Sequence, residues 1–192
     1  MILDLRWNIG GPRDYPIFLY SKLTDKPFKY VDHLITKKAT IDAKIPFDST
    51  KRYVHIKDDL FKVTNGFRGA GLQYPDSSNY KGNIYLLIDG QSNSSSGQIA
   101  SLVKSNNRGI IIGEEAGGIY SGGTGEYHHK IKLEHSQILI QIPRYRIVLS
   151  VDPSKNSMNK GTLPDYEITN TLDALMKNRD LCIEKAFELI KK

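Results

Sequence analysis

Four serines lie in a short polar turn between an apolar run and a helical pattern, where a serine hydroxyl could act as a nucleophile. This serine turn, residues 91–97, reads Gln-Ser-Asn-Ser-Ser-Ser-Gly. The first N–H groups of a helix have no partner within it and favour negative charge. A serine held there could attack a carbonyl carbon while neighbouring amides stabilise the oxyanion. The Gly-x-Ser-x-Gly form is absent, so the alternative that these serines only cap the helix stays open.

The serine turn lies between two apolar runs that predict parallel strands. Residues 83–90 and 109–113 are short, partly β-branched runs, typical of strands that are buried on both faces. Between them, Ile99, Leu102 and Val103 have the spacing of one helix face. A right-handed crossover would place the two strands side by side and parallel. The predicted fold class is therefore α/β.

Glycines occur at two further places where they could approach a ligand. A strand is predicted over residues 2–5, and Gly10 and Gly11 follow it, which allows bare backbone amides to come close to a substrate. The glycine loop, residues 114–125, contains five glycines after the second apolar run, at the sheet edge where α/β proteins keep their sites. No Lys-Ser/Thr pair follows in the required register, which argues against a phosphate-binding loop.

Periodicity and capping residues predict the remaining elements. The expected helices cover residues 16–23, 171–176 and 180–191, the last capped by Asp180. The expected strands cover residues 28–35, 130–133, 137–142 and 145–151, with the second and third forming a hairpin. Residues 36–83 show only short strand candidates, at 53–56 and 60–63, so this segment is expected to be largely irregular and to cover a site.

Composition is that of an ordinary globular protein. The 192 residues, of which 39% are hydrophobic and 25% charged, suit a single domain over residues 1–192. The net charge of +6 comes with scattered lysines, which favours a solvated surface over a nucleic-acid groove. No apolar run is long enough to span a membrane, and no signal peptide is present. Cys182 is the only cysteine, which excludes an internal disulfide.

Four separated motifs resemble those of one protein family. Residues 3–11 (Leu-Asp-Leu-Arg-Trp-Asn-Ile-Gly-Gly) resemble its first strand and turn, and residues 92–103 its serine turn and helix. Residues 108–118 are similar to its Arg-Ala-x-x-x-Gly-Glu-x-x-Gly strand, and residues 161–165 to its Gly-Val-x-Pro-Asp motif. The family is that of the tail-specific, or C-terminal processing, serine proteases, with the tricorn core protease and the interphotoreceptor retinoid-binding proteins. The chain looks most similar to exported members from Bacteroides-like bacteria.

This resemblance implies a ClpP/crotonase-like α/β spiral with a mainly parallel sheet flanked by helices. It also implies hydrolysis of a polypeptide substrate through an acyl-enzyme, without cofactor or metal, in the periplasm or otherwise outside the cytoplasm. With Arg108 as the anchor of the register, Ser94 is the expected nucleophile, Ser95 the second choice and Ser96 the third. The amides of Ser95 and Gly10 would form the oxyanion hole.

The family's general base is missing from its expected places. In the Ser–Lys branch the base lies in the glycine loop, at the position of Ile119. The tricorn-like branch uses an upstream His and Ser, with a Glu where this chain has Met158, Asn159 and Lys160. We therefore expect the base to come from an upstream domain before Met1, and residues 1–192 alone to be incomplete. The alternative is a catalytically inactive binding or scaffold domain of the same fold, for a peptide or an apolar ligand.

Overall fold

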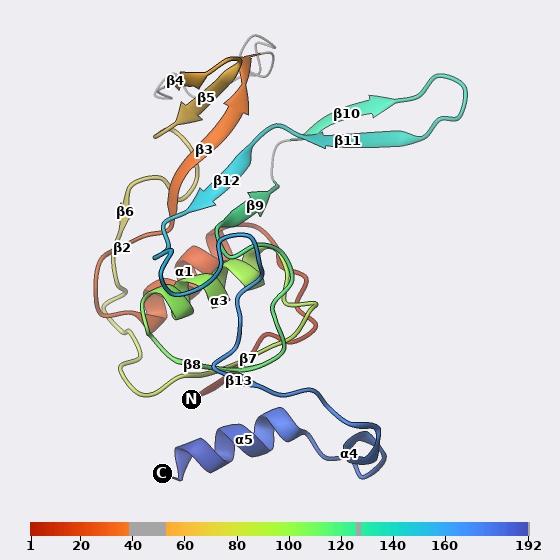
Figure 1. Ribbon diagram of the computed structural model, residues 1–192. Coiled ribbons are helices and arrows are strands. Elements are labelled where there is room, and N and C mark those ends of the chain that lie inside the picture. The colour runs from red at the N-terminus through yellow and green to blue at the C-terminus, as the bar shows by residue number, and fades with distance from the viewer. Residues whose placement is uncertain (39–52, 126–127, 192) are drawn as a thin grey trace. The chain divides into compact units, whose positions relative to one another are not determined.

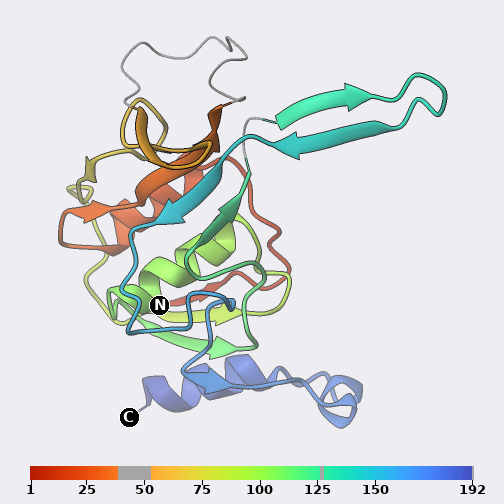
Figure 2. The same ribbon diagram turned by 45° about the horizontal axis from the view of Figure 1, so that its top comes forward.

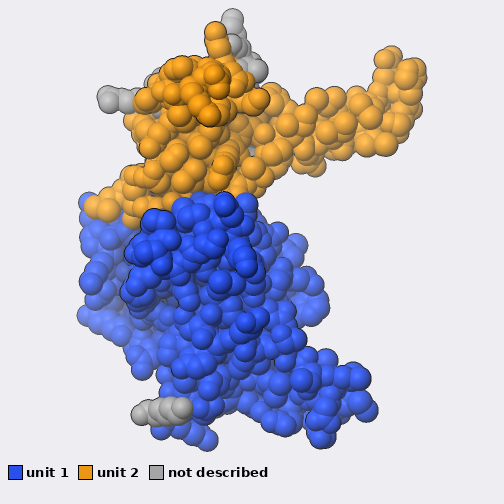
Figure 3. Space-filling model, in the orientation of Figure 1, with its two compact units in different colours: residues 1–28, 73–121, 151–192 blue, residues 29–72, 122–150 orange. Residues whose placement is uncertain are grey.

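The computed structural model of the protein describes residues 1–38, 53–125 and 128–191 (Figure 1). Two compact units make up the chain (Figure 3). Unit 1 consists of Met1–Phe28, Gln73–Ser121 and Val151–Lys192, and unit 2 of Lys29–Leu72 and Gly122–Ser150. Each unit combines segments that are distant in sequence. The single domain over residues 1–192 stays a prediction.

Unit 1 contains a four-stranded parallel sheet. Its strand order is β1 (Ile2–Asp4), β7 (Tyr85–Ile88), β8 (Ile110–Gly113) and β13 (Tyr166–Glu167). All neighbouring strands are parallel. The segments after β1, β7 and β8 therefore leave the sheet at the same edge. The predicted α/β class with a parallel sheet is confirmed, although β13 is too short to show a periodicity in the sequence.

Helices cover both faces of this sheet. Figures 1 and 2 show α1 (Asp14–Leu23) and α3 (Ser95–Ser105) on one side and α5 (Leu181–Ile190) on the other. The buried cluster on the α5 side consists of Tyr85, Leu87, Ile112, Cys182 and Ala186. Leu86 and Ile111 are also fully buried, and strand alternation turns them toward α3. Burial on both faces explains why these strands are continuous apolar runs in the sequence.

The predicted helices are confirmed as α1, α3, α4 (Leu172–Met176) and α5. Asp180 caps α5 as predicted, because its carboxylate accepts the N–H groups of Cys182 and Ile183, both at 3.1 Å. None of the helices in the described ranges combines the length and the apolar character needed to cross a membrane.

Unit 2 contains an antiparallel sheet and a hairpin. The sheet order is β4 (Tyr53–Lys57), β5 (Leu60–Val63), β3 (Val31–Lys37), β12 (Arg146–Leu149) and β9 (Gly122–Thr124). The predicted hairpin is confirmed as β10 (His128–Lys132) and β11 (Leu139–Pro143), and the short strands β2 (Phe28–Lys29) and β6 (Leu72–Gln73) pair with each other. The described part of residues 36–83 thus contains the two strand candidates. Residues 39–52 lie outside the described residues, and a covering role for the segment stays a prediction.

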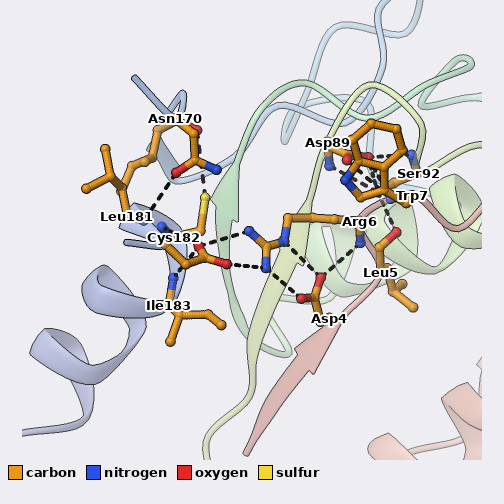
Figure 4. A network of polar contacts seen from close by, with 12 residues as sticks. Asp4, Leu5, Arg6, Trp7, Asp89, Ser92, Asn170, Leu181, Cys182 and Ile183 are labelled. Carbon is orange, nitrogen blue, oxygen red and sulfur yellow. Dashed lines mark hydrogen bonds and ion pairs between the residues drawn. The ribbon is translucent and has the colours of Figure 1, made fainter. Parts of the chain in front are cut away.

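Arg6 fastens the end of β1 to the start of α5 (Figure 4). Its Nη2 lies 2.7 Å from Asp4 Oδ2 and 2.7 Å from Asp180 Oδ2. The hydrogen bonds from the Arg6 guanidinium lower the pKa of Asp180. Partial burial alone would raise the pKa of Asp4, but the Arg6 hydrogen bonds outweigh it, so this pKa is also lowered. Both carboxylates are therefore stabilised in the charged form by one shared cation.

Arg6→Met is expected to lower the free energy of unfolding at neutral pH by about 2 kcal/mol, because it leaves two partly buried carboxylates without their cation. Both carboxyls have lowered pKa values in the folded state. Their contribution is therefore present above the unfolded value of about 4 and is lost as the pH falls through the folded values. Urea unfolding of both proteins should show a difference that shrinks below about pH 4. A difference that is independent of pH would contradict this network.

Candidate active site

Ser94 lies between the end of β7 and the start of α3 in a strained backbone conformation. Its φ is 53° and its ψ is −123°. A positive φ is unfavourable for a residue with a Cβ, at a cost of about 1–3 kcal/mol. The side chain is exposed and makes no capping bond to α3, and no hydrogen bond joins Ser94 Oγ to another described residue. An accessible serine hydroxyl on a strained strand-to-helix turn is the arrangement of a nucleophile elbow.

Gly10 packs directly against this serine. Its φ is +96°, and a Cβ added to it would lie 2.7 Å from Ser94 Cβ and 2.8 Å from Ser95 N. The N–H of Gly10 donates to Asn8 Oδ1 at 2.9 Å. Ser95 opens α3, where the N–H groups of the first turn have no partner within the helix. The structure thus brings together Ser94, Ser95 and Gly10, the three residues that the sequence nominates.

The other serines of the serine turn are buried and bind the first turn, residues 5–11. Each hydroxyl has an acceptor in a main-chain carbonyl of that turn: Ser92 Oγ in Leu5 at 2.8 Å, Ser95 Oγ in Gly11 at 2.5 Å, and Ser96 Oγ in Asn8. Ser92 Oγ also lies 3.2 Å from Asp89 Oδ1, and Ser96 Oγ 2.8 Å from Asn93 O. In the described part of the chain, Ser94 is therefore the only serine of this turn whose hydroxyl is not engaged. The hydroxyls of Ser95 and Ser96, the second and third choices for nucleophile, already have acceptors.

Further contacts join the first turn, the serine turn and the glycine loop. The N–H of Asn93 donates to Asn8 O at 3.1 Å. The carboxylate of Asp89 accepts the N–H of Trp7, with its two oxygens at 3.1 and 3.2 Å (Figure 4). A Cβ on Gly117 would lie 3.2 Å from Asn93 Cβ, so the glycine loop lies beside the serine turn. Sequence reasoning missed these positioning residues, although Asn8 is part of the first family-like motif.

A pocket of about 220 Å³ adjoins the first turn. Its walls include Leu5, Tyr15, Leu19 and Ile99, together with Gly10 and Ser95. The side chains are largely apolar, so the pocket suits an uncharged group. Among the described residues, no group of three or more His, Cys, Asp and Glu side chains could hold a metal ion.

The position at which the Ser–Lys branch carries its base holds no base in this chain. Ile119 is 43% exposed in the glycine loop and is aliphatic. The main-chain oxygens of Met158 and Lys160 accept bonds from Ser121 Oγ at 2.8 Å and Tyr120 N at 2.6 Å, which is a structural role. No His or Lys nitrogen of the described residues is hydrogen-bonded to Ser94 Oγ.

Residues 161–165, the last family-like motif, connect β8 and α3. Asp165 accepts the N–H of Ile111 at 2.8 Å and the ammonium of Lys104 at 2.5 Å. The N–H of Gly161 donates to Glu115 Oε1 at 2.7 Å. Asp165 therefore binds the start of β8 and the end of α3, whereas Gly161 binds the glycine loop, which extends from the end of β8.

Several solved structures are similar to this chain. A protein from Parabacteroides merdae ATCC 43184, described as a peptidase, has a TM-score of 0.66 and 16% identity, over 98% of this chain and 50% of that chain. Mature CPAF in complex with lactacystin has a TM-score of 0.61 and 16% identity, over 100% and 43%. A protein from Bacteroides fragilis NCTC 9343, described as an S41 protease, has a TM-score of 0.56 and 14% identity, over 99% and 44%.

At these identities the likeness shows the fold alone, and the chain spans half or less of the length of each of these structures. A search of curated proteins found no match. The model of one family, peptidase family S41, matches residues 1–168. This match covers most of the sequence and confirms the resemblance to the tail-specific proteases: the chain belongs to peptidase family S41.

Proposed function

We propose that this chain is the core domain of a serine endopeptidase and that Ser94 is its nucleophile. The observation that carries the proposal is the contrast within the serine turn. Ser94 is exposed, has a φ of 53° and keeps its hydroxyl unengaged among the described residues. The hydroxyls of Ser92, Ser95 and Ser96 are bound to carbonyls of the first turn. Strain that the surrounding structure maintains is typical of functional sites.

In the proposed reaction, Ser94 Oγ attacks the carbonyl carbon of a peptide bond and its proton passes to a general base. The carbonyl oxygen becomes an oxyanion, which the N–H of Ser95 stabilises. The N–H of Gly10 would be the second donor, after turning from Asn8 Oδ1 toward the oxyanion. The base then returns the proton to the leaving amine, and the acyl-enzyme that remains is hydrolysed by water. The apolar pocket beside Gly10 and Ser95 would hold an uncharged part of the polypeptide.

The general base is proposed to come from a segment outside residues 1–192. Two observations support this: Ser94 Oγ has no nitrogen partner among the described residues, and the similar structures are at least twice as long as the part that this chain covers. A serine hydroxyl without a base is too weakly acidic to attack an amide at neutral pH. If no base is ever supplied, the same fold is a binding or scaffold domain.

A peptidyl diphenyl phosphonate, which modifies activated serines, tests the proposal. We expect residues 1–192 to be labelled slowly, with one phosphonyl group per chain by intact mass. Free imidazole, an external base, should raise the rate by at least about 10-fold, since general-base assistance contributes about 10²–10⁴-fold in enzymes. An equal concentration of tetramethylammonium chloride, which cannot accept a proton, is the control.

Two results would count against this reading. No labelling with or without imidazole would favour the binding domain. Fast labelling that imidazole does not change would mean that residues 1–192 already supply a general base.

A further inference from the structure

We infer that three serines beside Ser94 are positioning residues, which hold the first turn where its amide can reach the reacting carbonyl. This serine clasp consists of Ser92, Ser95 and Ser96. The effect of the clasp on the reaction rate rests on the proposed function, whereas its hydrogen bonds do not depend on that proposal. The four serines of the serine turn then have two roles: Ser94 reacts, and the other three hold the first turn.

The first turn depends on bonds from outside. It lies between β1, which ends at Asp4, and α1, which begins at Asp14, so it belongs to neither element. Leu5 is buried, so the polar groups of its backbone need partners. The clasp serines are 0%, 8% and 5% exposed, and they donate to the carbonyls of residues 5, 11 and 8, respectively. These three hydroxyls therefore bind the first turn in addition to the bonds from Asn93 N–H to Asn8 O and from Trp7 N–H to Asp89.

The direction of these bonds separates the clasp from a helix cap. A capping serine accepts a hydrogen bond from an N–H group in the first turn of its own helix. Here each hydroxyl has an acceptor carbonyl more than eighty residues away, and the cap position Ser94 makes no capping bond. Ser96 Oγ has a second, local acceptor in Asn93 O at 2.8 Å. The reading in which the serines only cap α3 does not describe these contacts.

Ser95 links the two proposed oxyanion donors. Its own N–H is one of them. Its Oγ binds the carbonyl of Gly11, the residue that follows Gly10, whose N–H is the other. A shift of about 1 Å in such a group can cost about 10²-fold in rate. Loss of the Ser95 hydroxyl should therefore slow formation of the oxyanion more than it weakens binding.

Ser95→Ala tests the inference, with Ser101→Ala as the matched control. Ser101 is also in α3 and 1% exposed, but its Oγ donates to Gly97 O at 3.0 Å and lies 3.0 Å from Thr162 Oγ1, away from the first turn. In Ser95→Ala we expect the maximal phosphonate labelling rate to fall at least about 10-fold, with the half-saturating concentration unchanged within about 2-fold. Amide hydrogen exchange of residues 5–11 should become about 10-fold faster. Ser101→Ala should leave both readouts within about 2-fold.

Hydrogen exchange does not require a reactive serine, so the clasp and the proposed function can be tested independently. Unchanged exchange of residues 5–11 in Ser95→Ala would overturn the clasp. Faster exchange in a protein that no phosphonate labels would support the clasp and overturn the proposed function. Equal losses of labelling rate and of exchange protection in Ser95→Ala and Ser101→Ala would also overturn the clasp, because they would reflect general destabilisation of α3. If Ser95→Ala does not fold, Ser96→Ala provides the same comparison.

Discussion

Gly10→Ala is expected to lower the free energy of unfolding by about 3 kcal/mol or more, the sum of backbone strain and overpacking. The added Cβ would lie 2.7 Å from Ser94 Cβ and 2.8 Å from Asn93 O. Two of the nearby atoms belong to the backbone and cannot rotate away. The φ of +96° is also unfavourable for alanine. The variant should therefore push the first turn away from Ser94 and lose phosphonate labelling.

Gly11→Ala is the matched control for this substitution. Its φ lies outside the left-handed region, and the nearest atom to an added Cβ is Tyr15 Cδ2 at 3.8 Å, an ordinary contact. We expect its unfolding free energy to change by less than about 1 kcal/mol. Urea unfolding followed by circular dichroism measures both variants. Equal stability of the two variants would contradict the close packing of Gly10 on the serine turn.

Ser94→Gly is expected to abolish labelling by the phosphonate while leaving a more stable protein than Ser94→Ala. Both variants lack the hydroxyl. Only glycine adopts a φ of 53° and a ψ of −123° without a Cβ clash. The glycine variant should therefore be more stable than the alanine variant by about 1 kcal/mol, after allowance for the greater chain entropy of unfolded glycine.

The same urea experiment, together with intact-mass analysis after labelling, measures both effects. Labelling that persists in either variant would show that another residue reacts. A glycine variant no more stable than the alanine variant would mean that the backbone at Ser94 is not strained. Because the stability readout needs no reaction, strain and reactivity are tested independently.

The parallel sheet of unit 1 was predictable because β7 and β8 are continuous apolar runs and α3 between them is long enough to show a helical periodicity. β9 and β13 have only three and two residues, so no period identifies them. The division into two units was not predicted, because each unit joins segments that are distant in the sequence. Pairing between such distant segments is set by tertiary packing, which local patterns do not record.

The sequence predicted that three candidate residues lie together, but it did not predict the contacts that hold them. The motif register nominates Ser94, Ser95 and Gly10, and the structure brings these three together. The sequence offered two roles for the serines, nucleophile or cap. The bond from Ser92 Oγ to Leu5 O joins residues 87 positions apart, and no spacing rule predicts such a pair. The upstream base and the location outside the cytoplasm stay predictions.

The proposed chemistry depends on one hydroxyl, so the most direct measurement is to locate the adduct. The protein is labelled with the phosphonate in the presence of imidazole, digested, and sequenced by tandem mass spectrometry. The expected result is a phosphonyl group on Ser94 and on no other residue. A group on Ser95, on Ser96 or outside the serine turn would contradict Ser94 as the nucleophile.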